Sequence, residues 1–197
     1  MELTEDIRVF LPHWLNAADA RALWAQLKQF PRKMDYFATS HVDGELLQGD
    51  AWRGFAVFRP ELARLQPCVG FVLSNSCDVS PENKRALPVR AAFAPLVSVE
   101  KYIALLSGLK PAAMVQAQLD ALRRQEVTSV MYLPPPPGGE FGESLALLDD
   151  LHSEYVHAFL GSESRQRMFR LSQAGHYVLL LKLAIHFTRV QDGAVRG

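Results

Sequence analysis

The sequence predicts an α+β fold, in which a small, strongly bent antiparallel sheet or SH3-like barrel carries an N-terminal helix, an inserted helical pair and a packed C-terminal helix. Short apolar runs bounded by turn-forming residues recur through the middle of the chain, as in sheets built from hairpins. Helical periodicity is confined to the two ends and to one internal segment. Because the helices are segregated from the strands, a doubly wound parallel sheet is disfavoured.

The first helix is predicted over residues 16–30. Asn16 is a suitable N-cap, Pro31 ends the run, and the apolar residues between them follow helical spacing on one face. An inserted pair is predicted further on, where Ser98 can cap one helix and Pro111 suits the first position of the next. Both insertion helices lie where the chain otherwise reads as strands.

The last helix is predicted to begin after Ser172, which can cap it, and to run to about Arg189. Apolar residues surround nearly its whole circumference, so we expect it to be packed against the sheet. The chain then forms one domain over residues 1–197. Its core barrel covers about 36–98 and 128–171, the helical insertion about 99–126, and the C-terminal helix about 172–189.

The predicted strands are short apolar or aromatic runs that end at Gly, Pro, Asn, Asp or Ser. They cover Tyr36–Val42, Trp52–Phe58, Val69–Leu73, Leu87–Leu96, Thr128–Leu133, Leu145–Leu148, Tyr155–Phe159 and Gln166–Leu171.

Charge and cysteine content limit the classes of function. The 197 residues include 21 basic and 21 acidic side chains, so no net field attracts nucleic acid or a membrane, and a nucleic-acid contact requires a local patch. Two cysteines and an acidic N-terminus predict neither a disulfide framework nor a secretion signal, so a cytoplasmic protein is expected. The most apolar segment, residues 177–187, is interrupted by Lys182 and His186 and is too short to cross a bilayer, so no membrane contact is expected.

Candidate chemistry is concentrated where the central strand 69–73 ends, because a rigid scaffold can present reactive groups there. Cys77 is a candidate nucleophile, with Asp78 or a distant histidine, His41 or His186, as its orienting base. Three preceding side chains could donate hydrogen bonds to a developing oxyanion. They are Ser74, Asn75 and Ser76.

Structural roles for the same residues stay open. Free cysteines are commonly buried, and Asp, Ser and Asn are frequent turn residues. If Asp78 lies near the core, its carboxylate needs backbone N–H groups or a basic partner. The candidate partners are Arg53, Arg90 and Arg189.

Cofactor and metal motifs are missing from the sequence. It contains no phosphate-binding glycine loop, no dinucleotide fingerprint and no HExxH helix. Cys68 and Cys77 are too widely spaced for the short Cys-x-x-Cys hook of zinc sites. We therefore expect no cofactor and no metal.

Three short segments resemble the PemK/MazF toxin family. They are Gly49-Asp50 before a strand, the run Val69-Gly70-Phe71-Val72-Leu73-Ser74-Asn75, and Ala94-Pro95-Leu96-Val97-Ser98. The resemblance implies an SH3-like barrel, a toxin–antitoxin context, and cleavage of single-stranded RNA by an arginine and a threonine. Separately, the Ser-Cys-Asp run looks like a Thr/Ser-Cys-Asp signature of uncharacterised bacterial proteins of similar length.

The catalytic pair implied by this resemblance is incomplete here. Val97 stands at the threonine position with Ser98 next to it, and the arginine is matched only by Arg53 or Arg59. The expected function is therefore a cytoplasmic bacterial module that binds a nucleic acid or a partner protein, with a homodimer allowed, and that is not a competent ribonuclease. The alternative is a thiol-dependent enzyme that uses Cys77.

Overall fold

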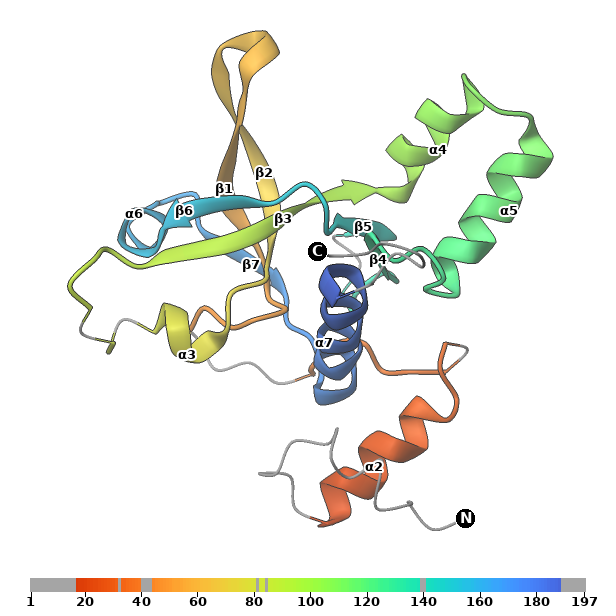
Figure 1. The fold of residues 1–197 in the computed structure, drawn as a ribbon, viewed down its shortest axis with the longest axis horizontal. Coiled ribbons are helices and arrows are strands. Elements are labelled where there is room, and N and C mark those ends of the chain that lie inside the picture. Colours follow the sequence, from red (N-terminus) through yellow and green to blue (C-terminus); the bar gives the residue numbers. More distant parts are fainter. Residues whose placement is uncertain are drawn as a thin grey trace, which may run out of the picture.

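A seven-stranded antiparallel sheet forms the frame of the computed structural model, which describes residues 17–31, 33–39, 44–80, 82–83, 85–138 and 141–188 (Figure 1). The strand order is β4-β5-β3-β2-β1-β7, and β6 pairs with β3. The strands are β1 Ala51–Arg59, β2 Arg64–Val72, β3 Arg90–Ser98, β4 Val130–Leu133, β5 Ser144–Leu147, β6 His152–Tyr155 and β7 Gln166–Phe169. The α+β class is confirmed, whereas the sheet is open at β4 and β7 and is not closed into a barrel.

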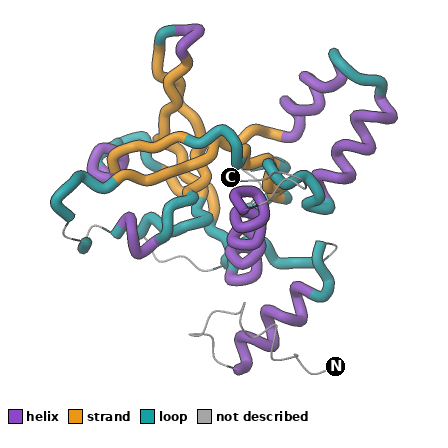
Figure 2. Tube along the Cα trace, in the orientation of Figure 1, coloured by secondary structure: helices purple, strands orange, loops and turns teal. Residues whose placement is uncertain are grey.

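The longer helices lie near the ends of the chain and in one insertion, as the periodicity predicts, whereas two short helices, α3 and α6, lie among the strands and were not predicted (Figure 2). They are α2 Ala17–Leu27, α3 Ser76–Val79, α4 Val99–Ser107, α5 Ala112–Arg123, α6 Val156–Leu160 and α7 Gln173–Thr188, with a 3-10 turn at Pro60–Leu62. Two predicted caps are present. Ser98 Oγ accepts a hydrogen bond from the Lys101 amide at 3.2 Å, and Ser172 Oγ accepts one from the Gly175 amide at 3.0 Å.

Two predicted strands are wrong in part. The segment predicted as a strand at 155–159 is mostly helix α6, because Val156 and Phe159 are three residues apart and both are buried. In the predicted strand 36–42, Phe37 makes an isolated bridge to Leu171, and residues 40–43 lie outside the described residues.

The β1–β2 hairpin extends well beyond its neighbours in the sheet. It is paired from Ala51 opposite Phe71 to Arg59 opposite Arg64, but β3 pairs with β2 only over residues 70–72. On the other side of the hairpin, β7 pairs with β1 only at Ala51 and Trp52, the first two residues of β1. The distal half is therefore a two-stranded arm that projects from the sheet (Figure 1).

Aromatic packing fixes one face of the sheet. The Phe55 ring stacks on both Phe93 and Phe159, with ring centroids 4.2 Å apart in each pair. Gly70 lies against two of these rings, and a Cβ at this position would meet Phe55 at 2.5 Å and Phe93 at 2.8 Å. The glycine of the central strand is therefore needed for close ring packing.

Helix α7 packs with one side only. Its buried residues include Tyr177, Val178 and Leu179, whereas apolar residues of its second half are 37–58% exposed. They are Leu180, Leu181, Ile185 and Phe187. The expected packing against the sheet is present, because Val178 and Leu179 share a core cluster with Phe71 and Phe169, but the apolar residues on the other side of the helix are exposed. No helix in the described part of the chain has the length and apolar character needed to cross a membrane.

Candidate functional site: a cationic groove

The polar residues after β2 serve first to hold the chain. Ser74 Oγ accepts a hydrogen bond from the Ala92 amide at 2.8 Å, which ties the strand end to β3. Asn75 Oδ1 accepts one from the Cys77 amide at 2.9 Å and caps α3. These side-chain oxygens accept hydrogen bonds from backbone amides. This is the structural role in a turn that the sequence allowed as an alternative to catalysis.

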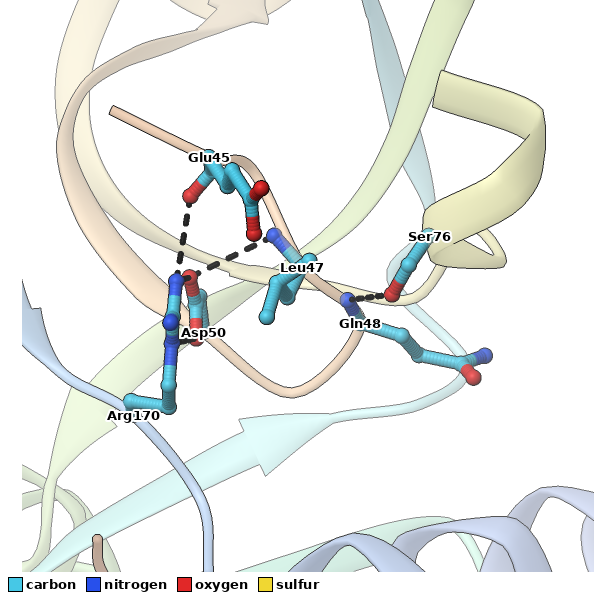
Figure 3. Close-up of polar contacts among 6 residues, drawn as sticks. All are labelled: Glu45, Leu47, Gln48, Asp50, Ser76 and Arg170. Atoms are coloured by element: carbon cyan, nitrogen blue, oxygen red, sulfur yellow. Dashed lines mark hydrogen bonds and ion pairs between the residues drawn. The ribbon is translucent and has the colours of Figure 1, made fainter. Parts of the chain in front are cut away.

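Ser76 joins this segment to the loop before β1. Its hydroxyl accepts a hydrogen bond from the Gln48 amide at 2.9 Å (Figure 3). The Gln48 side chain in turn donates to the Leu73 carbonyl at 2.7 Å and lies 3.1 Å from His176 Nε2 on α7. Burial lowers the pKa of His176, so this imidazole is neutral at pH 7 and bridges two parts of the fold.

Cys77 is exposed, and its surroundings do not form a nucleophile–base pair. Among the described residues, no histidine, lysine or arginine makes a hydrogen bond with its thiol. His41 lies outside the described residues, and His186 is in the last turn of α7, where its ring packs against Phe187. The structure therefore brings no described base to this thiol.

Asp78 is a surface residue with a partner different from those expected. Its carboxylate pairs with Arg85 at 2.5 Å, and the two side chains are 62% and 47% exposed. Arg53 and Arg90 are not its partners, and Arg189 lies outside the described residues. An exposed pair of this kind contributes little to stability.

Arg90 nevertheless shares a depression of about 630 Å³ with Ser74, Asp78 and Arg85. Its guanidinium donates to the Ser153 hydroxyl and carbonyl at 3.0 and 2.8 Å, so it is occupied within the fold. Asp78 neutralises Arg85 here, so Arg90 is the one cation among the described lining residues that lacks a carboxylate partner.

The buried carboxylate of this region is Asp50. It is 0% exposed and receives two hydrogen bonds of 2.9 Å from the Arg170 guanidinium (Figure 3). Arg170 also donates to the Glu45 carbonyl at 3.2 Å, and Asp50 accepts from the Leu47 amide at 3.3 Å. The Asp50 carboxylate thus forms a structural anchor, and both of its oxygens accept hydrogen bonds from within the protein.

A second cavity, of about 510 Å³, lies between the hairpin arm, the end of β3 and the start of α4. We call it the cationic groove, because its described lining includes three cations and no carboxylate. Its described lining residues are Arg53, Val57, Arg59, Gln66, Pro67, Cys68, Val69, Pro95, Leu96, Val97, Ser98, Lys101 and Phe141. Two of the sequence-predicted site residues, Arg53 and Ser98, therefore line one groove although they are far apart in the chain.

The three cations have no carboxylate partner among the described residues. Arg53 donates to the neutral Gln166 amide at 2.7 Å, and no described carboxylate pairs with Arg59 or Lys101. Charge without a counter-charge in a groove favours an anionic ligand. Sequence reasoning missed Lys101, whose only signal is its place in the first turn of the helix capped by Ser98.

A β-bulge sets the position of Arg53. The register of β1 against β2 shifts between Arg53 and Phe55, with Gly54 at φ +111°. A Cβ on Gly54 would lie 3.2 Å from the Arg165 backbone, so the close approach of the β7 side also requires glycine. Bulges of this kind re-aim side chains at strand edges.

Ser98 ends β3 and begins α4, and Val97 precedes it in the same groove. The Ser98 hydroxyl is already the cap of α4, accepting from the Lys101 amide. Opposite Ser98 on β5 is Ser144, which is fully buried and whose hydroxyl has no hydrogen-bond partner among the described residues. The Ser98 hydroxyl, one residue after Val97, is thus a helix cap.

Cys68 lies in the groove but is not an activated thiol. Burial, followed by the nearby Glu154 carboxylate, raises its pKa to about 11, although Arg59 acts in the opposite direction. The thiol is therefore protonated at neutral pH and is a poor nucleophile and metal ligand. In the described ranges, no three His, Cys, Asp or Glu side chains converge on a point where they could hold a metal ion.

Another cavity, of about 670 Å³, also has a basic lining, formed in part by Lys28, Lys33 and Arg124. Here Arg124 is neutralised by Glu126, to which it donates two hydrogen bonds of 2.6 and 3.0 Å. The cationic groove differs in that all three of its cations lack a carboxylate partner in the part of the chain that the structure describes. It is therefore the better candidate for binding an anionic ligand.

Comparison with known proteins does not assign this site. No family model matches the chain, and no curated protein matches it significantly.

Proposed function

We propose that the protein binds single-stranded nucleic acid in the cationic groove and does not cleave it. The observation that carries this proposal is a set of three cations, Arg53, Arg59 and Lys101, which have no carboxylate partner among the described residues and line a groove whose described lining contains no carboxylate. They occur in a chain whose 21 basic and 21 acidic residues balance, so the positive potential is local. Phosphate groups are the anions that such grooves bind along a polymer.

A single strand suits the groove better than a duplex. Apolar side chains such as Val69, Leu96 and Phe141 lie among the cations, and Phe141 is only partly buried. Unpaired bases can contact apolar and aromatic surface while their phosphates contact arginine and lysine. In a duplex the bases are stacked inside and cannot make the first kind of contact.

Binding without cleavage fits the groups that line the groove. Transfer of the RNA phosphate would need a base to remove the 2′ proton, and the described lining contains no histidine and no carboxylate. The Ser98 hydroxyl is engaged as a cap, and the Cys68 thiol is protonated. The resemblance to PemK/MazF thus supports a related binding module without the catalytic pair, although the open sheet departs from the expected barrel.

Fluorescence anisotropy with a labelled single-stranded RNA tests the proposal. The triple variant R53A/R59A/K101A should lose at least about tenfold in affinity at low salt, and its salt dependence should flatten by about two units of slope. The control K28A/K33A/R124A removes three cations from the other basic cavity and should bind like the wild type. Equal losses in both variants, or no binding by the wild type, would overturn the proposal.

Incubation of a long single-stranded RNA with the same preparations tests the absence of cleavage. We expect intact RNA with the wild type and with S98A. Cleavage that disappears in both R53A and S98A would assign the ribonuclease activity that the family resemblance implies.

A further inference from the structure

The outer end of the β1–β2 arm carries two arginines directly opposite each other. Arg59 ends β1 and Arg64 begins β2, and the register of the hairpin pairs them across the strands (Figure 1). Side chains paired in this way have Cβ atoms about 4.5–5.5 Å apart, and like charges so placed are destabilising. In the part of the chain that the structure describes, no carboxylate forms an ion pair with either arginine, and this includes Glu61 in the turn between them.

The two arginines lie on the face of the arm that forms one wall of the cationic groove. Side chains alternate between the two faces of a hairpin, so every second residue pair shares a face. Val57 and Gln66 are paired two positions before the arginines and line the groove, as does Arg59 itself. Arg64 is exposed at the outer end of the same face. The arm thus continues the positive charge of the groove to its tip.

We propose that Arg59 and Arg64 hold one phosphate of the bound strand between their guanidinium groups. The inference rests on the function proposed above, and it adds the path of the strand, which leaves the groove along the arm. A phosphate accepts hydrogen bonds from two guanidinium groups through different oxygens. Its negative charge also offsets the repulsion between the two arginines, which a neutral ligand cannot do. The like-charge pair is therefore suited to an anionic polymer.

Changes at Arg64 should affect binding and stability in opposite directions. R64A removes the repulsion, so it should keep the melting temperature of the free protein. It should nevertheless weaken binding of a labelled single-stranded RNA about three- to tenfold and lower the salt slope by about 0.7. R64E places opposite charges across the strands, so it should raise the melting temperature by about 1–4 °C and weaken binding more than R64A.

Two further variants separate the guanidinium pair from charge in general. R64K keeps the charge without the planar fork, so its affinity should fall between those of the wild type and R64A. R21A removes one exposed arginine from α2, which lies far from the arm in Figure 1, and should bind like the wild type.

The outcomes distinguish this inference from the proposed function. If R64A binds like R21A while R53A/R59A/K101A has lost affinity, the inference is overturned and the proposed function stands. If the wild type binds no single-stranded RNA, both are overturned. A melting temperature of R64E below that of the wild type would show that the two arginines do not repel each other, and would overturn the inference as well.

Discussion

The Asp50 carboxylate is fully buried and pairs through both oxygens with the guanidinium of Arg170, which follows it by 120 residues. The pair joins the turn before β1 to the segment between β7 and α7, so it links the first and last strands of the sheet to each other. Arg170 reaches the Glu45 carbonyl with the same guanidinium. A buried and well-satisfied pair of this kind specifies how the two segments meet.

Removing one partner of this pair should destabilise the protein strongly. D50A leaves the Arg170 side chain, 11% exposed, without its counter-charge, and should lower the free energy of unfolding by about 3–5 kcal/mol. Urea denaturation measures this change. The matched control is D78A, which breaks the exposed pair with Arg85 and should cost less than about 1 kcal/mol. Equal losses in D50A and D78A would contradict the assignment of Asp50 as the anchor.

Lys182 should make stability depend on pH in the alkaline range. The residue is 5% exposed, its ammonium group donates to the Gln125 and Val127 carbonyls, and burial lowers its pKa from 10.5 to about 8. Below pH 8 the folded and unfolded chains both carry this proton, so its contribution is constant. Between pH 8 and 10.5 the unfolded chain binds more protons, so stability should rise with pH, on the order of 2 kcal/mol.

The variant K182M separates the contribution of Lys182 to the pH dependence of stability from the contributions of tyrosines and cysteines, which titrate in the same pH range. Urea midpoints of wild type and K182M, measured from pH 7 to above pH 10, should diverge in favour of the wild type as pH rises. Parallel curves would mean that folding does not change the pKa of this lysine.

The two cysteines should differ sharply in alkylation by iodoacetamide near pH 8. Cys77 is exposed and should be modified, whereas the Cys68 thiol, with a pKa of about 11, should be protected in the native protein. Mass spectrometry of peptides distinguishes the sites, and denatured protein should react at both. Faster modification of Cys68 than of Cys77 would show an activated thiol in the groove.

Gly175 should tolerate no side chain. A Cβ at this position in the first turn of α7 would collide with the backbone carbonyl of Tyr36, which cannot move aside as a flexible side chain could. G175A should therefore lower the free energy of unfolding by about 1–3 kcal/mol in thermal or urea denaturation. G142A is the control, since a Cβ there meets no atom within 4 Å and should change stability by less than about 0.5 kcal/mol.

Features fixed by neighbouring residues could be predicted from the sequence. Ser98 and Ser172 cap helices at the expected places, and the helical insertion begins where the strand pattern stops, because capping depends on a few consecutive residues. Whether a residue is buried or exposed depends instead on segments that are distant in the sequence, so it could not be predicted in the same way. Asp78 follows a buried strand closely yet lies at the surface, whereas Asp50 is buried because Arg170 reaches it from the other end of the chain.

In the candidate site, too, single residues could be predicted from the sequence, whereas their arrangement in space could not. Arg53 and Ser98 could be proposed from a resemblance, but their meeting in one groove depends on the β1 bulge and on the partial pairing of β2 with β3. Phe141 carries no local signal of binding, and Lys101 carries only its place in the first turn of the helix that Ser98 caps. They reach the groove because α4 begins at the end of β3 and because Phe141 packs beside Phe169.

The projecting hairpin has a consequence for how this protein behaves at high concentration. The outer edge of β2 beyond its pairing with β3 is open, and open strand edges invite strands from other molecules to join them and aggregate. Pro67 lies in this stretch and has no N–H to offer to an incoming strand. The arm therefore extends into solvent with an edge that resists pairing with strands of other molecules. Arg53 and Arg59 on this arm thus stay available to the ligand proposed for the cationic groove.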